Sequence, residues 1–287
     1  MTKTITIELG GLTFDCLAAG NEKDPLILFL HGFPETAFMW KNLIEDFSKK
    51  GFYGVAPNQR GYSKGACPNG KKNYRLNLLV EDIIGISKAL NKHKFHLVGH
   101  DWGAVVGWKV THDHPDKVLS WSALSVPHIQ AFGNAMMTNP EQKKMSQYVK
   151  NFQIPFLPEM RIMKKDLALF KRLWKYSSEE EVADYLSVFR NRKQLTAALN
   201  YYRANYRMLK QAAKQQILGP IKVPTLFIWG NKDIAIGRAG VEASHKFMKG
   251  PYEFLELDAG HWLIQTNYKD LKNVLFSLIK HEEEKSS

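Results

Sequence analysis

Short apolar runs rich in β-branched and aromatic residues alternate along most of the chain with longer amphipathic segments. The runs are a hairpin in the first twenty residues, followed by 26–30, 53–57, 95–99, 119–126, 225–230 and 252–257. Amphipathic segments such as 73–92 and 267–284 separate or follow these runs. The alternation predicts an α/β fold in which an eight-stranded, mostly parallel sheet carries helices on both faces.

One long interval interrupts this alternation. Between Pro127 and Leu218 there is no clear strand, and the segments with helical periodicity are rich in Lys, Met, Phe and Tyr. Connections between neighbouring elements of an α/β unit usually take about 2–6 residues, so this interval is too long to be a simple crossover. We therefore expect an α/β core formed by residues 1–126 and 219–287, with a helical cap, residues 127–218, inserted into it.

Composition limits the partners and the compartment. The formal charge is +12, but the lysines are scattered along the sequence without a zinc-finger, RNP-like or polybasic cluster, so we expect a solvated basic surface and no nucleic-acid partner. Cys16 and Cys67 are the two cysteines, which indicates reduced thiols in a cytoplasmic protein. The N-terminus lacks a signal-peptide pattern, and no apolar run approaches the about 20 residues that span a bilayer. No pattern indicates an oligomeric state.

Polar residues follow four of the predicted strands directly. Ligands of open α/β sheets bind outside the carboxyl ends of the strands, so these residues are expected to meet at one edge. They are His31-Gly32-Phe33-Pro34, His100-Asp101-Trp102, Asn231-Lys232-Asp233 and Asp258-Ala259-Gly260-His261. Two carboxylates and a histidine thus occur in the chain order nucleophile, acid, base.

The stretch Gly99-His100-Asp101-Trp102-Gly103 has the form of a nucleophile elbow, a sharp strand-to-helix turn whose middle residue is usually serine. Asp101 alone could be a helix N-cap, Asp233 a turn residue and His261 a packed core histidine. The glycines on both sides of Asp101, and the presence of all three partners, favour catalysis instead. We predict that Asp101 is the nucleophile, Asp233 the acid and His261 the base.

A second stretch, Gly61-Tyr62-Ser63-Lys64-Gly65, matches the serine-hydrolase pattern G-x-S-x-G literally. That pattern requires a strand directly before the serine and a helix directly after it. Here three residues separate the predicted strand from the motif, and a Pro/Gly/Asn loop follows, so Ser63 is not expected to be a nucleophile. The sequence contains no Walker loop or dinucleotide fingerprint, and we expect neither a cofactor nor a metal.

The motifs HGFP, GHDWGA, the aspartate of WGNKD and the histidine of GHW resemble those of the α/β-hydrolase superfamily, in its epoxide hydrolase branch, which is related to haloalkane dehalogenases. The resemblance runs over nearly the whole chain. It implies hydrolysis of a small apolar epoxide to a vicinal diol through an ester on Asp101, which water activated by His261 and Asp233 then cleaves. It also implies an oxyanion hole formed by the backbone N–H groups of Phe33 and Trp102. An aspartate near its ordinary pKa of ~3.9 is already ionised and can attack without a base.

The same resemblance points to two tyrosines that protonate the epoxide oxygen. The family patterns Y-x-x-x-F-Q and L-N-[WY]-Y-R match Tyr148 and Tyr202, and Tyr206, one turn beyond Tyr202, is a fallback. Phe33 and Trp102 are expected to contact the substrate together with these tyrosines. Some of a further apolar set could line the pocket, although most of the set is expected to pack within the cap: Phe132, Met136, Met137, Phe152, Ile154 and Phe156.

Three alternatives remain beside epoxide hydrolysis. Haloalkane dehalogenases commonly have Asn where this chain has Phe33, and fluoroacetate dehalogenases have Arg where it has Trp102, so a haloalkane or haloacid dehalogenase is the runner-up. A serine esterase acting through Ser63 is less favoured. A non-catalytic ligand-binding receptor on the same fold is disfavoured because every expected catalytic residue is present.

Overall fold

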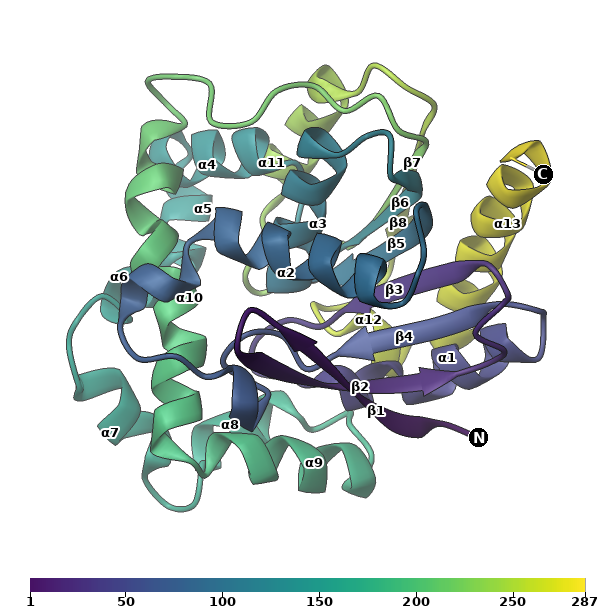
Figure 1. The fold of residues 1–287 in the computed structure, drawn as a ribbon. Helices are drawn as coiled ribbons and strands as arrows, with labels where there is room; N and C mark the ends of the chain where they lie inside the picture. The colour runs from purple at the N-terminus through teal and green to yellow at the C-terminus, as the bar shows by residue number, and fades with distance from the viewer. Residues whose placement is uncertain (287) are drawn as a thin grey trace.

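The computed structural model describes residues 1–286, and within them a single eight-stranded sheet forms the centre of the molecule (Figure 1). The strands are β1 (Lys3–Leu9), β2 (Leu12–Ala19), β3 (Leu26–Leu30), β4 (Tyr53–Pro57), β5 (Phe95–His100), β6 (Val118–Leu124), β7 (Thr225–Gly230) and β8 (Tyr252–Leu257). Their order in the sheet is β1-β2-β4-β3-β5-β6-β7-β8. The pairs β1–β2 and β2–β4 are antiparallel and the other pairs are parallel, which confirms the predicted fold class.

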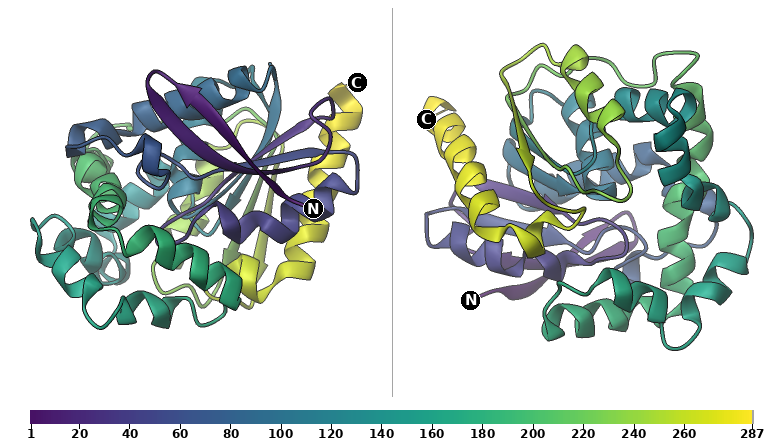
Figure 2. Two further views of the ribbon diagram at one scale, coloured as in Figure 1. Left: turned by 60° about the horizontal axis from the view of Figure 1, so that its bottom comes forward. Right: turned by 180° about the vertical axis from the view of Figure 1, so that it is seen from behind.

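Helices of the core cover both faces of this sheet (Figures 1 and 2). They are α1 (Lys41–Ser48), α2 (Leu76–Ala89), α3 (Trp102–Asp113), α11 (Arg238–Ala243), α12 (Leu263–Thr266) and α13 (Tyr268–Ser286). Helices α2 and α3 lie on one face, and α1 and α13 lie on the other. The helix predicted over 73–92 is shorter at both ends in the structure, where α2 spans Leu76–Ala89. A 3₁₀ turn, Lys71–Tyr74, precedes its first residue. The amide of Asn205, distant in sequence, accepts the Leu76 N–H at 2.9 Å and fixes the start of α2.

Seven helices lie between β6 and β7, and we refer to them as the helical insertion. They are α4 (Ile129–Thr138), α5 (Pro140–Met145), α6 (Gln147–Asn151), α7 (Leu157–Met163), α8 (Ala168–Leu173), α9 (Glu179–Phe189) and α10 (Arg192–Gln211). The insertion runs past the edge of the sheet to which the parallel strands point (Figure 1).

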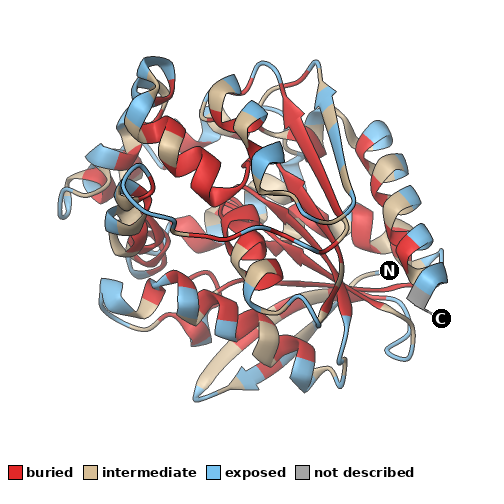
Figure 3. Cartoon of the chain, turned by 90° about the horizontal axis from the view of Figure 1, so that it is seen from above, coloured by how far each residue is buried: buried red, intermediate tan, exposed pale blue. Residues whose placement is uncertain are grey.

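The core is concentrated in the middle of the sheet. Every residue of β3, β4, β5 and β7 is buried, whereas β8 at the far edge alternates between partly buried and exposed residues (Figure 3). Strands covered on both faces read as continuous apolar runs, which explains why the central strands were the clearest in the sequence. None of the helices in the described part of the chain has the length and apolar character that crossing a bilayer requires.

The turn from β5 into α3 depends on two glycines. A Cβ atom on Gly103 would lie 2.0 Å from the carbonyl oxygen of Leu30, and one on Gly99 would lie 2.5 Å from the carbonyl oxygen of Gly103. The start of α3 therefore sits directly against β3 and β5. Between the glycines, Asp101 has φ 50° and ψ −117°, a conformation that costs a non-glycine residue about 1–3 kcal/mol.

This close approach predicts a strong effect of Gly103→Ala on stability. The added methyl group can be accommodated only if α3 moves away from β3, and we expect a loss at or above the upper end of the about 1–3 kcal/mol typical of overpacking. Chemical denaturation of the variant measures it. Gly260→Ala is the matched control, because its Cβ would meet only the carbonyl oxygen of Lys232 at 3.9 Å. Equal stability of the two variants would contradict the close-packing account.

Candidate active site

A cavity of about 240 Å³ opens between the carboxyl edge of the sheet and the helical insertion. Its wall combines residues of the strand ends with aromatic residues of the insertion: Phe33, Pro34, Asp101, Tyr148, Phe152, Phe170, Leu173, Tyr202, Ile234, Ala235, His261 and Trp262. Most of this wall is apolar. The polar side chains within it are those of Asp101, His261, Tyr148 and Tyr202, all of which the sequence had singled out.

Three of the strand-end residues form a chain of contacts. Nδ1 of His261 lies 2.7 Å from Oδ2 of Asp233, and Nε2 of the same ring lies 3.6 Å from Oδ2 of Asp101. The other carboxylate oxygen of Asp233 accepts the N–H groups of Ala235 at 2.7 Å and Ile236 at 2.9 Å, which fixes its orientation. His261 is therefore held between two carboxylates that come from different strands.

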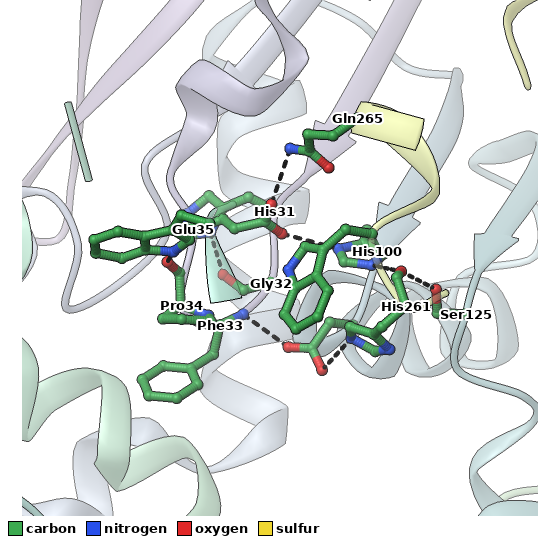
Figure 4. Close-up of polar contacts among 12 residues, drawn as sticks. His31, Gly32, Phe33, Pro34, Glu35, His100, Ser125, His261 and Gln265 are labelled. Carbon is green, nitrogen blue, oxygen red and sulfur yellow. Dashed lines mark hydrogen bonds and ion pairs between the residues drawn. The ribbon is translucent and has the colours of Figure 1, made fainter. Parts of the chain in front are cut away.

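The loop after β3 contributes a donor to the Asp101 carboxylate. The N–H of Phe33 donates to Oδ1 of Asp101 at 2.7 Å (Figure 4). A Cβ on Gly32 would lie 2.3 Å from Cβ of Asp101, so only glycine lets this loop approach the carboxylate so closely. Asp101 is the N-cap residue of α3, which begins at Trp102, so its carboxylate lies near the positive end of that helix although it accepts no capping hydrogen bond. One oxygen of Asp101 is thus held by the backbone, and the other faces His261.

Electrostatics favour a charged pair at this site. Burial alone would raise the pKa of the Asp101 carboxyl, but the hydrogen bond and charge of His261, with smaller contributions from His100 and the Phe33 N–H, bring it below its ordinary value. Burial alone would lower the pKa of His261, but Asp233 and Asp101 together raise it well above its ordinary value. The two side chains therefore stabilise each other's charged forms, the carboxylate of Asp101 and the imidazolium of His261.

The two tyrosines lie together on the opposite wall of the cavity. The ring centroids of Tyr148 and Tyr202 are 5.9 Å apart, and Phe33 packs edge-on against Tyr202 at 5.5 Å. Burial, reinforced by the negative charge of Asp101, raises the pKa of both hydroxyls well above the ordinary value. Both side chains are therefore neutral proton donors at physiological pH. The Trp102 ring packs behind Tyr202 at 5.0 Å and is not part of the cavity wall.

Some of the sequence candidates lie elsewhere. Tyr206 lines a separate hollow beside Met136 and Lys210, not the cavity of Asp101. Ser63 is buried, and its hydroxyl donates to the carbonyl of Asn58 at 2.7 Å and accepts the N–H of Asp15 at 2.9 Å. A short 3₁₀ turn, Lys64–Ala66, follows this serine. The two hydrogen bonds of Ser63 join its loop to other backbone groups and indicate a structural role.

One of the six apolar candidates lines the cavity. Phe152 lines the cavity, but Phe132 is buried elsewhere and Met136 and Met137 lie at the separate hollow of Tyr206. Ile154 and Phe156 are exposed at the surface of the insertion. Composition could not distinguish these positions, because the direction of each short helix in the insertion depends on its tertiary contacts.

A buried polar network behind His261 was not anticipated from the sequence. The carbonyl oxygen of His261 accepts from Nε2 of His100 at 2.9 Å and from the hydroxyl of Ser125 at 2.8 Å (Figure 4). Nδ1 of His100 faces the fully buried carboxylate of Glu35 at 3.1 Å, and the amide of Gln265 donates to that carboxylate at 3.0 Å. The network holds the backbone of His261 in place. Glu35 follows HGFP directly, and its position in a strand-end loop was the signal that could have identified it.

Comparisons with known proteins agree with this geometry. The family model described as alpha/beta hydrolase fold matches residues 25–268. Epoxide hydrolase 4 of Homo sapiens is 30% identical over 98% of this chain and 79% of the relative, and Epoxide hydrolase 3 of Xenopus tropicalis is 28% identical over 97% and 77%. The crystal structure of Bacillus megaterium epoxide hydrolase in complex with an inhibitor superposes with a TM-score of 0.87 at 25% identity, covering 96% of this chain and all of that one.

The matched fold and the residues at its strand ends define an α/β hydrolase. The identity and coverage of the relatives narrow this class further, and the chain belongs to the epoxide hydrolase branch of the alpha/beta hydrolase fold family.

The position of His261 between two carboxylates predicts how its pKa responds to the charge of Asp101. Because the Asp101 charge raises the pKa of His261, Asp101→Asn should lower it, so that the ring loses its proton at a lower pH than in the wild type. Titration of ¹⁵N-labelled histidine by NMR measures the shift. The control is His128, which lies outside the cavity and should titrate identically in both proteins. An unchanged His261 titration would show that the two side chains do not interact as described.

Proposed function

We propose that the protein hydrolyses an epoxide to a vicinal diol through a covalent ester on Asp101. The observation that carries this proposal is that one apolar cavity brings together an ionised carboxylate, a histidine paired with a second carboxylate and two neutral tyrosines. A carboxylate can displace at carbon, and an epoxide oxygen needs a proton donor as the ring opens. The cavity supplies both.

In the first step, a carboxylate oxygen of Asp101 attacks a ring carbon and the carbon–oxygen bond of the epoxide breaks. The ring oxygen takes its proton from Tyr148 or Tyr202, and the product is an alkyl ester of Asp101. Raised tyrosine pKa values keep the protons in place until the developing alkoxide, which is the stronger base, draws one away. This step needs no help from His261.

In the second step, water attacks the ester carbonyl carbon of Asp101. Esterification removes the negative charge of Asp101, which had raised the pKa of His261. The ring then gives up its proton, to the tyrosinate that the first step leaves, and becomes a neutral base. His261 then takes a proton from the water, and Asp233 stabilises the imidazolium that forms. The N–H groups of Phe33 and Trp102 stabilise the oxyanion, since Phe33 already donates to Oδ1 of Asp101. Collapse of the intermediate breaks the ester bond, and the departing alkoxide takes the proton held by His261 to give the diol. The carboxyl group of Asp101 then returns a proton to His261.

The walls of the site support an apolar substrate. Phe33, Phe152, Phe170, Leu173 and Trp262 surround the reacting groups and offer large apolar surfaces. A halide leaving group would lack a side-chain donor at position 33, which weighs against dehalogenation.

We assign residues 127–218 as a cap domain that closes the cavity over a core of 1–126 and 219–287. The buried, free thiols of Cys16 and Cys67 support the cytoplasm as the compartment.

The tyrosines give a test of epoxide chemistry. Tyr148→Phe and Tyr202→Phe should each slow ring opening, and the double variant should lose about 10²–10⁴-fold, because each donor partly replaces the other. Tyr206→Phe is the matched control and should leave turnover unchanged. Diol formation from styrene oxide, with halide release from 1-chlorohexane measured in parallel, reports the reaction. Halide release without diol formation would support the dehalogenase alternative.

The division of labour between Asp101 and His261 gives a second test. In His261→Gln, alkylation should proceed while hydrolysis stops, so the enzyme should accumulate a covalent adduct on Asp101. Intact-protein and peptide mass spectrometry with excess styrene oxide detects it. The double variant His261→Gln/Asp101→Asn should remain unmodified. A His261→Gln protein that forms no adduct under saturating epoxide would contradict a first step independent of histidine.

A further inference from the structure

The positive charge of the protein is concentrated in two stretches of the chain that contain no acidic residue. There is no Asp or Glu between Asp46 and Glu81, nor between Asp184 and Asp233. The first stretch contains the loop of residues 68–74, and the second contains α10. Lysines and arginines that are spaced along the sequence can therefore come together in space without neutralising neighbours.

Folding brings these two stretches together. The amide of Asn205 on α10 accepts the N–H of Leu76 and donates to the carbonyl of Tyr74, both at 2.9 Å. The hydroxyl of Tyr201 donates to the carbonyl of Arg60 at 2.7 Å. The loop before α2 is thus fixed against α10, at the seam between the core and the helical insertion.

A hollow of about 300 Å³ lies at this seam, outside the cavity of Asp101. The loop contributes Pro68, Asn69, Gly70 and Tyr74, and α10 contributes Arg192, Lys193, Thr196, Ala197 and Asn200. No carboxylate is part of this wall. Its volume is at the lower end of the about 300–1,000 Å³ typical of small-molecule sites.

The two cations of the hollow have no acidic partner. Within residues 1–286, neither Arg192 nor Lys193 forms an ion pair, and both are exposed. Other arginines nearby are neutralised, because Arg60 pairs with Asp82 at 2.6 Å and Arg203 pairs with Glu159 at 2.7 Å. The hydroxyl of Thr196, in the wall of the hollow, donates to Glu159, and this carboxylate also accepts from Arg203. The charge of Arg192 and Lys193 is available to a ligand.

Asn200 adds a polar group to the wall of the hollow beside the two cations. Its side chain lines the hollow, only 6% of the residue is exposed, and its amide has no hydrogen-bond partner among the described residues. The amide is not fully buried, and its polar atoms reach the solvent of the hollow. The Asn200 amide can donate two N–H groups to an acceptor placed between it and the two cations.

We propose that this hollow binds a small phosphate monoester, with the phosphate held by Arg192, Lys193 and the Asn200 amide. Phosphate carries about −1.5 to −2 charges near neutral pH and three acceptor oxygens, which suits two cations and an amide donor better than a carboxylate does. The apolar surfaces of Tyr74, Pro68 and Ala197 take the organic part. The ligand touches both the core loop and α10, so it ties the helical insertion to the core. This site is independent of the epoxide chemistry.

Calorimetric titration of the full chain with phenyl phosphate at low ionic strength tests the site. We expect saturable one-to-one binding, weakened at least about tenfold in Arg192→Gln/Lys193→Gln by the loss of charge-assisted hydrogen bonds. Lys210→Gln/Lys214→Gln is the matched control. It removes the same charge at the last turn of α10 and in the turn that follows, and it should bind as the wild type does. Both double variants should retain epoxide turnover measured without phosphate.

A third variant and two further probes make the test specific. Asn200→Leu should weaken phenyl phosphate binding while unfolding at an unchanged temperature, because its amide has no partner in the free protein. Benzoate should bind more weakly than phenyl phosphate, and equal binding would overturn the choice of phosphate. The site itself is overturned if the wild type shows no saturation, or if both double variants lose binding equally. Attachment to phosphatidylglycerol vesicles without saturable phenyl phosphate binding would also overturn it.

Discussion

The placement of His261 between the carboxylates of Asp233 and Asp101 is the interaction on which the rest of this site depends. The two carboxylates come from the ends of β7 and β5, and the histidine comes from the loop after β8. Parallel pairing aligns the ends of these strands, since Gly99 pairs with Ala123, Leu124 with Ile228 and Gly230 with Leu257. A sheet with a different strand order would not bring these three side chains together.

The same arrangement explains why His261 takes no part in the first step of the proposed reaction and acts as the base in the second. The charges of Asp233 and Asp101 raise the pKa of His261, and forming the ester would remove the second of them. The strained backbone of Asp101 and the glycines around it serve this arrangement, because they present the carboxylate at the tip of a sharp turn. The stability lost at that turn is offset by the large buried core beneath it.

Much of this could be predicted from the sequence, because the responsible signals are local. The apolar runs gave the strands, and the polar residues that follow them gave Asp101, Asp233 and His261. The buried partners Glu35 and His100 were missed because their pairing joins different strand-end loops. The hollow beside Arg192 was also missed, since the cations appear scattered until two acid-free stretches pack together. Long-range contacts of this kind have no signature in local sequence.

The central claim is that Asp101 forms a covalent ester, and the origin of the product oxygen tests it most directly. A single turnover with enzyme in excess over epoxide, in water labelled with ¹⁸O, should give unlabelled diol. The label should appear in the peptide that contains Asp101, because water attacks the carbonyl carbon of the ester. Enzyme labelled beforehand by many turnovers should then transfer ¹⁸O to product in ordinary water. Labelled diol in the first turnover, with no label in the Asp101 peptide, would contradict covalent catalysis.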